Sequence, residues 1–392
     1  MMKMKLKAGY KNTDVGVIPK DWGVDAIKNL AVIKTGSKNT QDRIESGVYP
    51  FFVRSQTVER INSFSFDGEA VLTAGDGVGV GKVMHYINGK FDCHQRVYRI
   101  SNFSENLEGY FFYLYFSTNF YSRIMQMTAK SSVDSVRMEM IADMQIPLPP
   151  TKSEQTAIAN ALSDADALIS SLEKLIEKKR NIKQGAMQQL LKPKKGWDKK
   201  SIKEIVQTPV TDGPHETPVF YAMGIPFLSV NNLVDKKIDF TDLRYISVED
   251  HLIYSKKCKP QRNDILLGKA ASVGKVAIVE TDLEFNIWSP IAMIRVKSDY
   301  SSKYVYYYLQ TEDIVKQIDF FTNSSSQGNI GMGDIEKIEI PLPKTLAEQK
   351  EIATILSDMD NEISSLEKKL SKSKMLKQGM MQELLTGKIR LV

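Results

Sequence analysis

Apolar residues recur at alternating spacings of four and three along two long stretches of the chain, 146–191 and 340–385. This seven-residue repeat predicts a long helix with one narrow apolar seam, the pattern of a coiled coil. The seam positions are Ile158, Leu162, Ile169, Leu172, Ile176 and Leu190 in the first stretch and Ile352, Leu356, Ile363, Leu366, Leu370 and Leu384 in the second.

The two stretches are copies of one another. The first aligns on the second without insertion or deletion at a constant offset of 194 residues, and both contain a Glu-Gln pair, an SSLEK segment and a KQG segment. Self-similarity of this kind predicts two copies of one structural unit.

Each predicted helix has a clear start. The prolines of IPLP cannot lie inside a helix, so the helix begins after them. Thr151 and Thr345 are each followed three residues later by Glu, which is the capping-box pattern. A helix of ~40 residues would be roughly 60 Å long, too long for the core of an ordinary domain, so we expect the two helices to pack on one another.

Upstream of each helix, short runs of β-forming residues alternate with glycine-rich turns. The predicted strands are 49–53, 70–73, 82–87 and 96–100 in the first half and 225–230, 264–267, 275–279 and 291–296 in the second. An aromatic-rich helix follows, GYFFYLYF from Gly109 and KYVYYYLQ from Lys303, and Tyr110 aligns with Tyr304 at the offset of 194. Helical spacing favours a core position for these rings over a role in base stacking.

These patterns predict an α+β fold with an internal two-fold repeat. We expect two mixed α/β domains, at 1–145 and 196–339, each followed by one long helix, at 146–195 and 340–392. The chain length of 392 residues and its 42% hydrophobic and 26% charged content suit a soluble protein of two domains. Two cysteines, Cys93 and Cys258, are too few for a disulfide framework and favour the reducing cytoplasm.

The chain has a formal charge of +6 and a pI near 8.9. A basic chain favours a polyanionic partner. Lysines concentrate at the end of the first long helix and just after it, where they either form a solvated helix face or contact such a partner.

Common catalytic motifs are absent from the sequence. GDGVGVGK from Gly75 to Lys82 lacks the spacing and the Ser or Thr of a phosphate-binding loop, and so does GKAASVGK from Gly268 to Lys275. We interpret both as turns between strands whose lysines are free to meet a DNA phosphate. The four histidines have no metal-binding spacing, and we find no hydrolase, zinc-protease, amino-methyltransferase or dinucleotide motif. The sequence therefore predicts a binding subunit without catalysis and without a bound metal.

The combination of IPLP, Glu-Gln, SSLEK and KQG in two long helices, each after an unlike domain, resembles the specificity (S) subunits of type I restriction-modification systems. The resemblance covers essentially the whole chain, and IPKDW before Gly23 and FVRSQTV from Phe52 also look like segments of such subunits.

The resemblance implies a fold and a set of partners. Each variable domain would be a target recognition domain that reads one half of a bipartite, asymmetric DNA site, and the repeated helices would form an antiparallel coiled coil that sets the spacer. Two modification (methyltransferase) subunits would bind this scaffold and carry S-adenosylmethionine. Restriction subunits with translocase and nuclease activity would bring ATP and magnesium. No cofactor is expected in this chain.

Base edges are read by Arg, Lys, Asn, Gln, Ser and Thr, and phosphates are held by Arg and Lys. Because His94 and Trp288 align at the offset of 194, we expect their loops to be equivalent. The predicted DNA-binding residues are Arg54, Ser55, Gln56, Thr57, Lys82, His94, Gln95, Arg96, Lys130 and Ser131 in the first half and Ser229, Asn231, Asn232, Lys269, Ser272, Lys275, Trp288, Ser325, Gln327 and Asn329 in the second.

Other functions stay open at this point. The chain could be the recognition subunit of another combined restriction and methylation enzyme, or a non-enzymatic coiled-coil DNA-binding scaffold. A nuclease or methyltransferase with a diverged site would need clustered carboxylates or a cofactor loop, and the sequence has neither.

Overall fold

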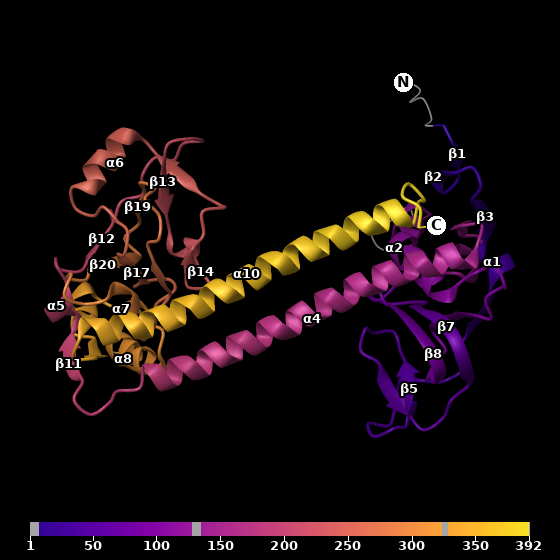
Figure 1. The fold of residues 1–392 in the computed structure, drawn as a ribbon, viewed down its shortest axis with the longest axis horizontal. Helices are drawn as coiled ribbons and strands as arrows, with labels where there is room; N and C mark the ends of the chain where they lie inside the picture. The colour runs from indigo at the N-terminus through magenta and orange to yellow at the C-terminus, as the bar shows by residue number, and fades with distance from the viewer. Residues whose placement is uncertain (1–7, 128–134, 324–327, 392) are drawn as a thin grey trace. The chain divides into compact units, whose positions relative to one another are not determined.

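The computed structural model describes residues 8–127, 135–323 and 328–391 (Figure 1). The chain forms two compact units. Unit 1 is Met1–Glu173 together with Lys368–Val392, and unit 2 is Lys174–Glu367. Each unit thus combines the start of one long helix with the end of the other, whereas the domains expected from sequence were contiguous segments. Among the described residues no helix is long and apolar enough to cross a membrane.

Unit 1 is built on a six-stranded sheet. Its order is β4 (Val32–Thr35), β9 (Val97–Ser101), β7 (Phe66–Ala74), β8 (Met84–Cys93), β5 (Tyr49–Phe52) and β6 (Glu59–Ile61). All neighbours are antiparallel except β5 and β8, which are parallel. Two smaller antiparallel sheets pair β1 (Tyr10–Thr13) with β2 (Gly16–Pro19) and β3 (Gly23–Ala26) with β10 (Gln145–Leu148).

The helices of unit 1 cover a core of aliphatic and aromatic side chains. They are α1 (Ile27–Leu30), the 3-10 turn Thr40–Asp42, α2 (Gly109–Gln126), α3 (Met138–Ala142) and the parts of α4 (Lys152–Leu190) and α10 (Leu346–Leu384) that belong to this unit. In α2, Phe112, Phe116 and Phe120 are fully buried. This burial confirms the prediction that the aromatic stretch forms core. Burying each ring contributes ~2 kcal/mol to stability.

Unit 2 repeats this plan with additional short elements. One sheet has the order β12 (Thr211–Asp212), β20 (Ile291–Ile294), β17 (Ile265–Gly268), β18 (Val276–Ile278), and another has the order β16 (Arg244–Ile246), β13 (Ile225–Leu228), β19 (Asn286–Ile287). Two-stranded sheets pair β14 (Leu233–Val234) with β15 (Lys237–Ile238) and β11 (Asp198–Ser201) with β21 (Glu339–Leu342). The helices are α5 (Ile202–Ile205), the 3-10 turn Val230–Asn232, α6 (Val248–Ser255), α7 (Ser302–Tyr308), α8 (Glu312–Asn323) and α9 (Met332–Ile335).

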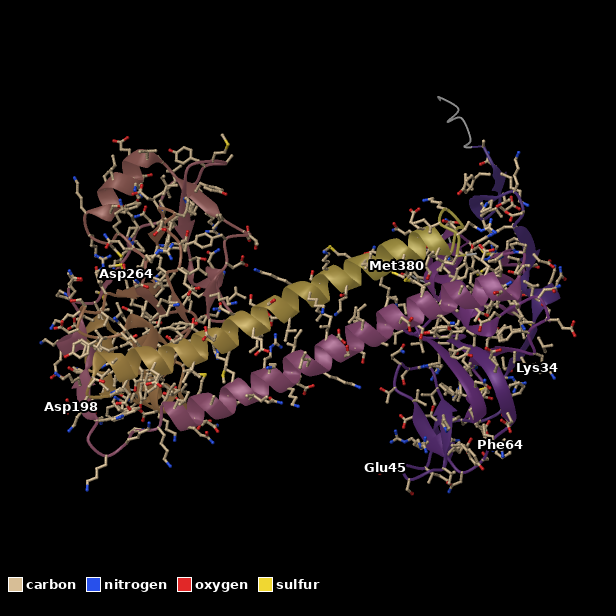
Figure 2. The ribbon with its side chains drawn as sticks, in the orientation of Figure 1. Lys34, Glu45, Phe64, Asp198, Asp264 and Met380 are labelled. Atoms are coloured by element: carbon tan, nitrogen blue, oxygen red, sulfur yellow. The ribbon has the colours of Figure 1, made fainter. Side chains whose placement is uncertain are left out.

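A buried ion pair fixes two central strands of unit 2. The Asp264 side chain, labelled in Figure 2, is 3% exposed, and its carboxylate accepts hydrogen bonds of 2.8 and 2.6 Å from Nε and Nη2 of Arg295. Asp264 directly precedes β17 and Arg295 directly follows β20, so the pair closes the end of this antiparallel ladder.

The internal repeat extends to individual hydrogen bonds. The amide of His94 donates to the Phe52 carbonyl at 2.9 Å in unit 1, and the amide of Trp288 donates to the Leu228 carbonyl at 2.9 Å in unit 2. Both residues directly follow a short parallel pairing, β5 with β8 and β13 with β19. The predicted equivalence of the His94 and Trp288 loops is confirmed.

The predicted alignment of Tyr110 with Tyr304 is wrong by one residue. Helix α2 begins after the cap Glu108, which accepts from the Phe111 amide, and α7 begins after the cap Ser301, which accepts from the Tyr304 amide. Tyr304 therefore occupies the position of Phe111. The two copies differ in length by one residue between these caps and the next short helices, α3 and α9, so the offset of 194 does not reach the start of the aromatic helices.

The capping box is formed only in part. The amide of Glu154 donates to Oγ1 of Thr151 at 3.2 Å, and Glu348 and Thr345 make the same bond at 3.2 Å. The Glu154 carboxylate does not return to the helix start but pairs with the Arg390 guanidinium, with 2.8 Å between Oε2 and Nη2. Because this carboxylate is buried, an opposite charge stabilises it more than a backbone amide would.

The glutamine of the repeated Glu-Gln pair connects three segments. In unit 1, Oε1 of Gln155 accepts from the Glu108 amide at 2.8 Å, and Nε2 donates to the carbonyls of Asn106 and Pro149 at 2.8 and 3.3 Å. In unit 2, Gln349 accepts from the Ser301 amide at 3.0 Å and donates to the Pro343 carbonyl at 3.1 Å. One side chain thus holds the proline-containing segment, the long helix and the aromatic helix together.

The long helices pair in opposite directions within each unit. In unit 2, Lys183 of α4 pairs with Asp360 of α10 at 2.5 Å, and in unit 1, Lys377 of α10 pairs with Asp166 of α4 at 2.6 Å. These two ion pairs are related by the offset of 194 and lie where the apolar seam is interrupted. Among the seam positions, Ile158, Leu162, Leu172, Ile176, Ile352, Leu356, Ile363 and Leu384 are buried, and Ile169, Leu190, Leu366 and Leu370 are partly buried.

Replacing the buried glutamine of unit 1 tests its role. In Gln155→Leu the Glu108 amide and the Asn106 carbonyl lose their partner, so we expect the free energy of unfolding to fall by about 2 kcal/mol or more. Urea titration of the full chain, followed by circular dichroism, measures the change. Thr156→Ala, at an exposed position of the same helix, is the control. Equal urea midpoints for the two variants would contradict the role assigned to Gln155.

Candidate nucleic-acid interface

In each unit three loop segments meet at the ends of the interior strands β7 and β17, and we call this end of the sheet its edge. In unit 1, Gly75 at the end of β7 donates its amide to the Arg96 carbonyl at 2.8 Å and accepts at its own carbonyl from the Val136 amide at 2.8 Å. In unit 2, Lys269 makes the same two bonds, to the Pro290 carbonyl at 2.8 Å and from the Ile330 amide at 3.0 Å. The backbone of this edge is therefore the same in both units.

In unit 1 this edge carries two arginines on one carboxylate. Nη1 of Arg54 lies 2.7 Å from Oδ1 of Asp76, and Nη1 of Arg96 lies 3.2 Å from Oδ2. The Arg54 and Arg96 side chains are 45% and 63% exposed, whereas the carboxylate is 21% exposed. Within the described part of the chain neither guanidinium has another hydrogen-bond or ion-pair partner, so both can reach a ligand.

His94 lies beneath this pair as a structural residue. Its side chain is 5% exposed, and Nδ1 accepts a hydrogen bond of 2.9 Å from the Arg96 amide. Burial lowers the pKa of His94, and the charge of Arg54 lowers it further, so the imidazole is neutral near pH 7. The sequence placed His94 among the base-reading residues, and the structure uses it to hold the turn that carries Arg96.

The neighbouring polar residues predicted from sequence lie on the same loops. Gln95 is exposed and donates from Nε2 to Oδ1 of Asn39 at 2.6 Å. Ser55, Gln56 and Thr57 are exposed, and Oγ of Ser55 donates to the Thr57 carbonyl at 2.9 Å. These four side chains are available to a ligand, and their contacts with DNA stay a prediction.

The interpretation of the two glycine-rich segments as turns is confirmed. Gly75–Lys82 connects β7 to β8, and Gly77 and Gly81 have positive φ values of 80° and 67°, which side chains rarely adopt. Lys82 is exposed, and its Nζ lies 5.6 Å from the ring centroid of Tyr121 in α2. It is therefore separate from the carboxylate that holds the two arginines.

Unit 2 builds a different cation cluster at its edge. The Asp212 carboxylate is fully buried and has Nζ of Lys257 at 2.6 Å, Nζ of Lys269 at 3.1 Å and Nε2 of His215 at 3.2 Å. Burial raises the pKa of Asp212, but the hydrogen bonds and charges of Lys257 and Lys269 outweigh it and the net pKa is lowered. Asp212 is thus an ionised anchor for two lysines.

Asn232 and Ser229, both predicted to bind DNA, are engaged within their own loop. Oδ1 of Asn232 accepts from the amide and hydroxyl of Ser229 at 3.0 and 3.2 Å, and Nδ2 donates to the carbonyls of Asp239 and Asp242 at 3.2 and 2.9 Å. These bonds use the side chain of Asn232 to fix the loop after β13.

The other predicted residues of unit 2 occupy several loops. Asn231 and Lys275 are exposed, and Ser272, Trp288 and Asn329 are partly buried. Trp288 lies against Phe227, with 6.2 Å between ring centroids. Four further predicted residues, Lys130, Ser131, Ser325 and Gln327, lie outside the described residues.

The residues that sequence reasoning missed are mainly the anchors. Asp76, Asn39, Asp212 and Lys257 were not predicted. An acidic residue is not expected to approach DNA, and Lys257 lies 45 residues from the carboxylate that it contacts. The one available signal was the Asp-Gly step Asp76-Gly77, which lies inside the Gly75–Lys82 turn that the sequence did identify.

Neither cysteine has the properties of a nucleophile. Burial raises the pKa of Cys93 and of Cys258 to about 12, so both are neutral thiols near neutral pH. In the described ranges no three His, Cys, Asp or Glu side chains form a group that could hold a metal ion.

Removing the anchor of unit 2 tests the cation cluster. Asp212→Ala leaves the largely buried Lys269 ammonium without a counter-charge, so we expect a loss of about 3 kcal/mol and a fall of about 10 °C in the Tm of the transition to which unit 2 contributes. Differential scanning calorimetry of the full chain measures the change. In the control Asp282→Ala, an exposed pair with Arg262 is lost, and the shift should be much smaller.

The sign of the pH dependence follows from the lowered pKa of Asp212. The stabilisation is fully present above the ordinary value of 3.8 and is lost as the pH falls through the lower folded-state value. The difference in stability between the wild type and Asp212→Ala should therefore have its full size at pH 7. A difference that appears only below pH 4 would contradict the assignment.

Relatives support one family over the whole chain. The family model described as the type I restriction modification DNA specificity domain matches twice, at residues 19–184 and 194–373. The putative type I restriction enzyme MjaX specificity subunit of Methanocaldococcus jannaschii is 28% identical and covers 100% of this chain and 99% of its own length. The type I restriction enzyme EcoDI specificity subunit of Escherichia coli is 33% identical over 41% of this chain and 35% of its own length.

Solved structures share the fold. The S subunit of a type I restriction-modification system from M. genitalium has a TM-score of 0.65 at 17% identity, over 97% of this chain and 98% of that one. A chain of a type I system studied for its complex assembly has a TM-score of 0.54 at 15% identity, over 95% and 99%. Because the family model matches both halves and most of the chain, the chain belongs to the family of type I restriction-modification DNA specificity subunits.

Proposed function

We propose that this chain recognises a bipartite, asymmetric DNA site, with one half read by the domain of unit 1 and the other by the domain of unit 2. The observation that carries this proposal is the shared edge with unlike side chains. The backbone bonds of Gly75 recur at Lys269, yet one edge presents two arginines on Asp76 and the other presents two lysines on Asp212. Equivalent frames with different chemistry suit two different half-sites.

The composition of these edges suits a nucleic acid. Arg and Lys side chains contact the phosphates or the base edges of a nucleic acid, and the surrounding Gln, Asn, Ser and Thr side chains supply donors and acceptors for base edges. In each unit these side chains project from loops, while the strands beneath them keep a fixed register.

We further propose that α4 and α10 set the spacer between the half-sites and dock two modification subunits. The pairing of Lys183 with Asp360 and of Lys377 with Asp166 supports a fixed register between the helices. S-adenosylmethionine would then be bound by the modification subunits, and ATP and magnesium by restriction subunits. The chain itself would be non-catalytic and would work in the cytoplasm, where cellular and incoming DNA meet.

The first test is a methylation map of the host genome with and without this gene. Loss of adenine methylation at one split, asymmetric motif is the expected result, because the proposed role of the chain is to direct methylation to that motif. An unchanged map in cells that express a partner methyltransferase would contradict the proposal.

Exchange of one domain separates the two half-sites. When residues 22–145 are replaced by the recognition domain of another specificity subunit, one half of the methylated motif should change and the other should persist, since the two units have separate cores. The same map reads the outcome. Changes in both halves would contradict independent recognition.

Lengthening the helices tests the spacer. Inserting one heptad into both α4 and α10 adds about 10 Å of helix, so the spacer in the methylated motif should grow by about three base pairs. Insertion into only one helix is the matched control and should abolish methylation by breaking the register. An unchanged spacer in the double insertion would mean that the helices do not measure it.

A further inference from the structure

The geometry of the Arg54, Asp76 and Arg96 cluster of unit 1 indicates a more specific ligand than a generic basic surface would. Both arginines use the same group, Nη1, to contact the carboxylate, at 2.7 and 3.2 Å. A guanidinium has five N–H donors in a fixed plane. The Nε and Nη2 groups of each arginine are not used by other side chains or by the backbone in the described residues, so each keeps a two-donor edge for a ligand.

We propose that Arg54 and Arg96 read guanine bases in the half-site of unit 1 and that Asp76 is the positioning residue that fixes both guanidiniums. This inference rests on the proposed function and specifies the chemistry of one of its two sites. Guanine presents two acceptors, O6 and N7, in the major groove, and a two-donor arginine edge matches them.

The carboxylate disfavours the alternative that both arginines hold phosphates. A phosphate bound to either guanidinium would lie close to the negative charge of Asp76 and would be repelled. The neutral edge of guanine meets no such repulsion. Asp76 therefore weakens sequence-independent binding at this point and favours base recognition, the use of a repulsive element to gain specificity.

Asp76 is itself rigidly held. The adjacent Gly75 is bonded on both sides, to the Arg96 carbonyl and from the Val136 amide, and Asp76 forms a backbone bridge with Ser135. On the other side, buried His94 accepts from the Arg96 amide at 2.9 Å. Arginine side chains lose considerable conformational entropy on binding, and contacts that order them beforehand reduce that cost.

The test uses the full chain in its host, with the genomic methylation map as readout, after a domain exchange has assigned one half-site to unit 1. Arg54→Ala and Arg96→Ala should each relax the motif at a guanine of that half-site. We expect the preference for guanine there to fall at least fivefold, the factor equivalent to about 1 kcal/mol. The half-site of unit 2 should stay unchanged.

Three further variants separate base reading from charge, and two controls separate it from folding. Arg54→Lys and Arg96→Lys keep the positive charge but lose the planar fork, so they should relax the same guanines. Asp76→Asn removes the charge and should relax those guanines too, while increasing sequence-independent DNA binding. Lys28→Ala and Asp143→Asn break another ion pair of unit 1, at 2.8 Å, and are the controls, for which the motif should not change.

The outcomes are distinct. A uniform fall in methylation at all sites with an unchanged motif, or full activity of the lysine variants, would mean that the arginines hold phosphates and would overturn the inference. A change in Asp76→Asn confined to a different base pair would overturn its positioning role. If no methylated motif depends on this chain at all, the proposed function fails as well, a result that the wild type alone reveals.

Discussion

The pairing of α4 with α10 is the constraint on which both units depend. Unit 1 starts α4, and the buried seam residues Ile158 and Leu162 share their core with Leu384 and Leu385 at the end of α10. Without those last turns of α10, the first turns of α4 would expose apolar surface. Unit 2 meets the same requirement with the end of α4. The core of each unit therefore needs residues from both long helices, which are distant in sequence. Because the long helix occurs twice in the repeat, both units obtain the same apolar helix surface.

The polar interruptions of the seam give this pairing its register. Apolar seams alone tolerate slippage by one heptad, because each step replaces one aliphatic contact with another. Lys183 has a side chain that is 11% exposed, so a slip would leave its charge buried without Asp360, at a cost of several kcal/mol. The same argument holds for Lys377 and Asp166, although that pair is more exposed. The KQG segment, where the apolar pattern weakens, is thus the place where the alignment of the helices is determined.

The sequence predicts those parts of the fold that carry a local period. The long helices and the aromatic helices follow from spacing, and Thr151 marks a helix start correctly because its cap is a local interaction. Two-residue strands such as β14 and β12 carry no period and were not predicted. The alignment of Tyr110 with Tyr304 failed because one added residue is invisible where two aromatic runs resemble each other.

The candidate site, like the fold, could be predicted from the sequence only in part. Arg54 and Arg96 follow from residue type and position in loops, but Asp76 belongs to a different loop, and only the folded sheet brings the three together. Gly75 and Lys269 keep identical backbone bonds, so the side chains of this edge can differ between the units while the frame is conserved.

In both units a carboxylate holds two cations, and it comes from different elements: Asp76 from the turn after β7, and Asp212 from β12. The two units therefore share a pair of cations held by one carboxylate, although the carboxylates do not occupy equivalent positions in the repeat. The cations differ in kind, since a guanidinium fork matches two acceptors in one plane and an ammonium is a point charge. The two edges therefore present donors of different geometry to a ligand, which is consistent with the proposal that they read two different half-sites.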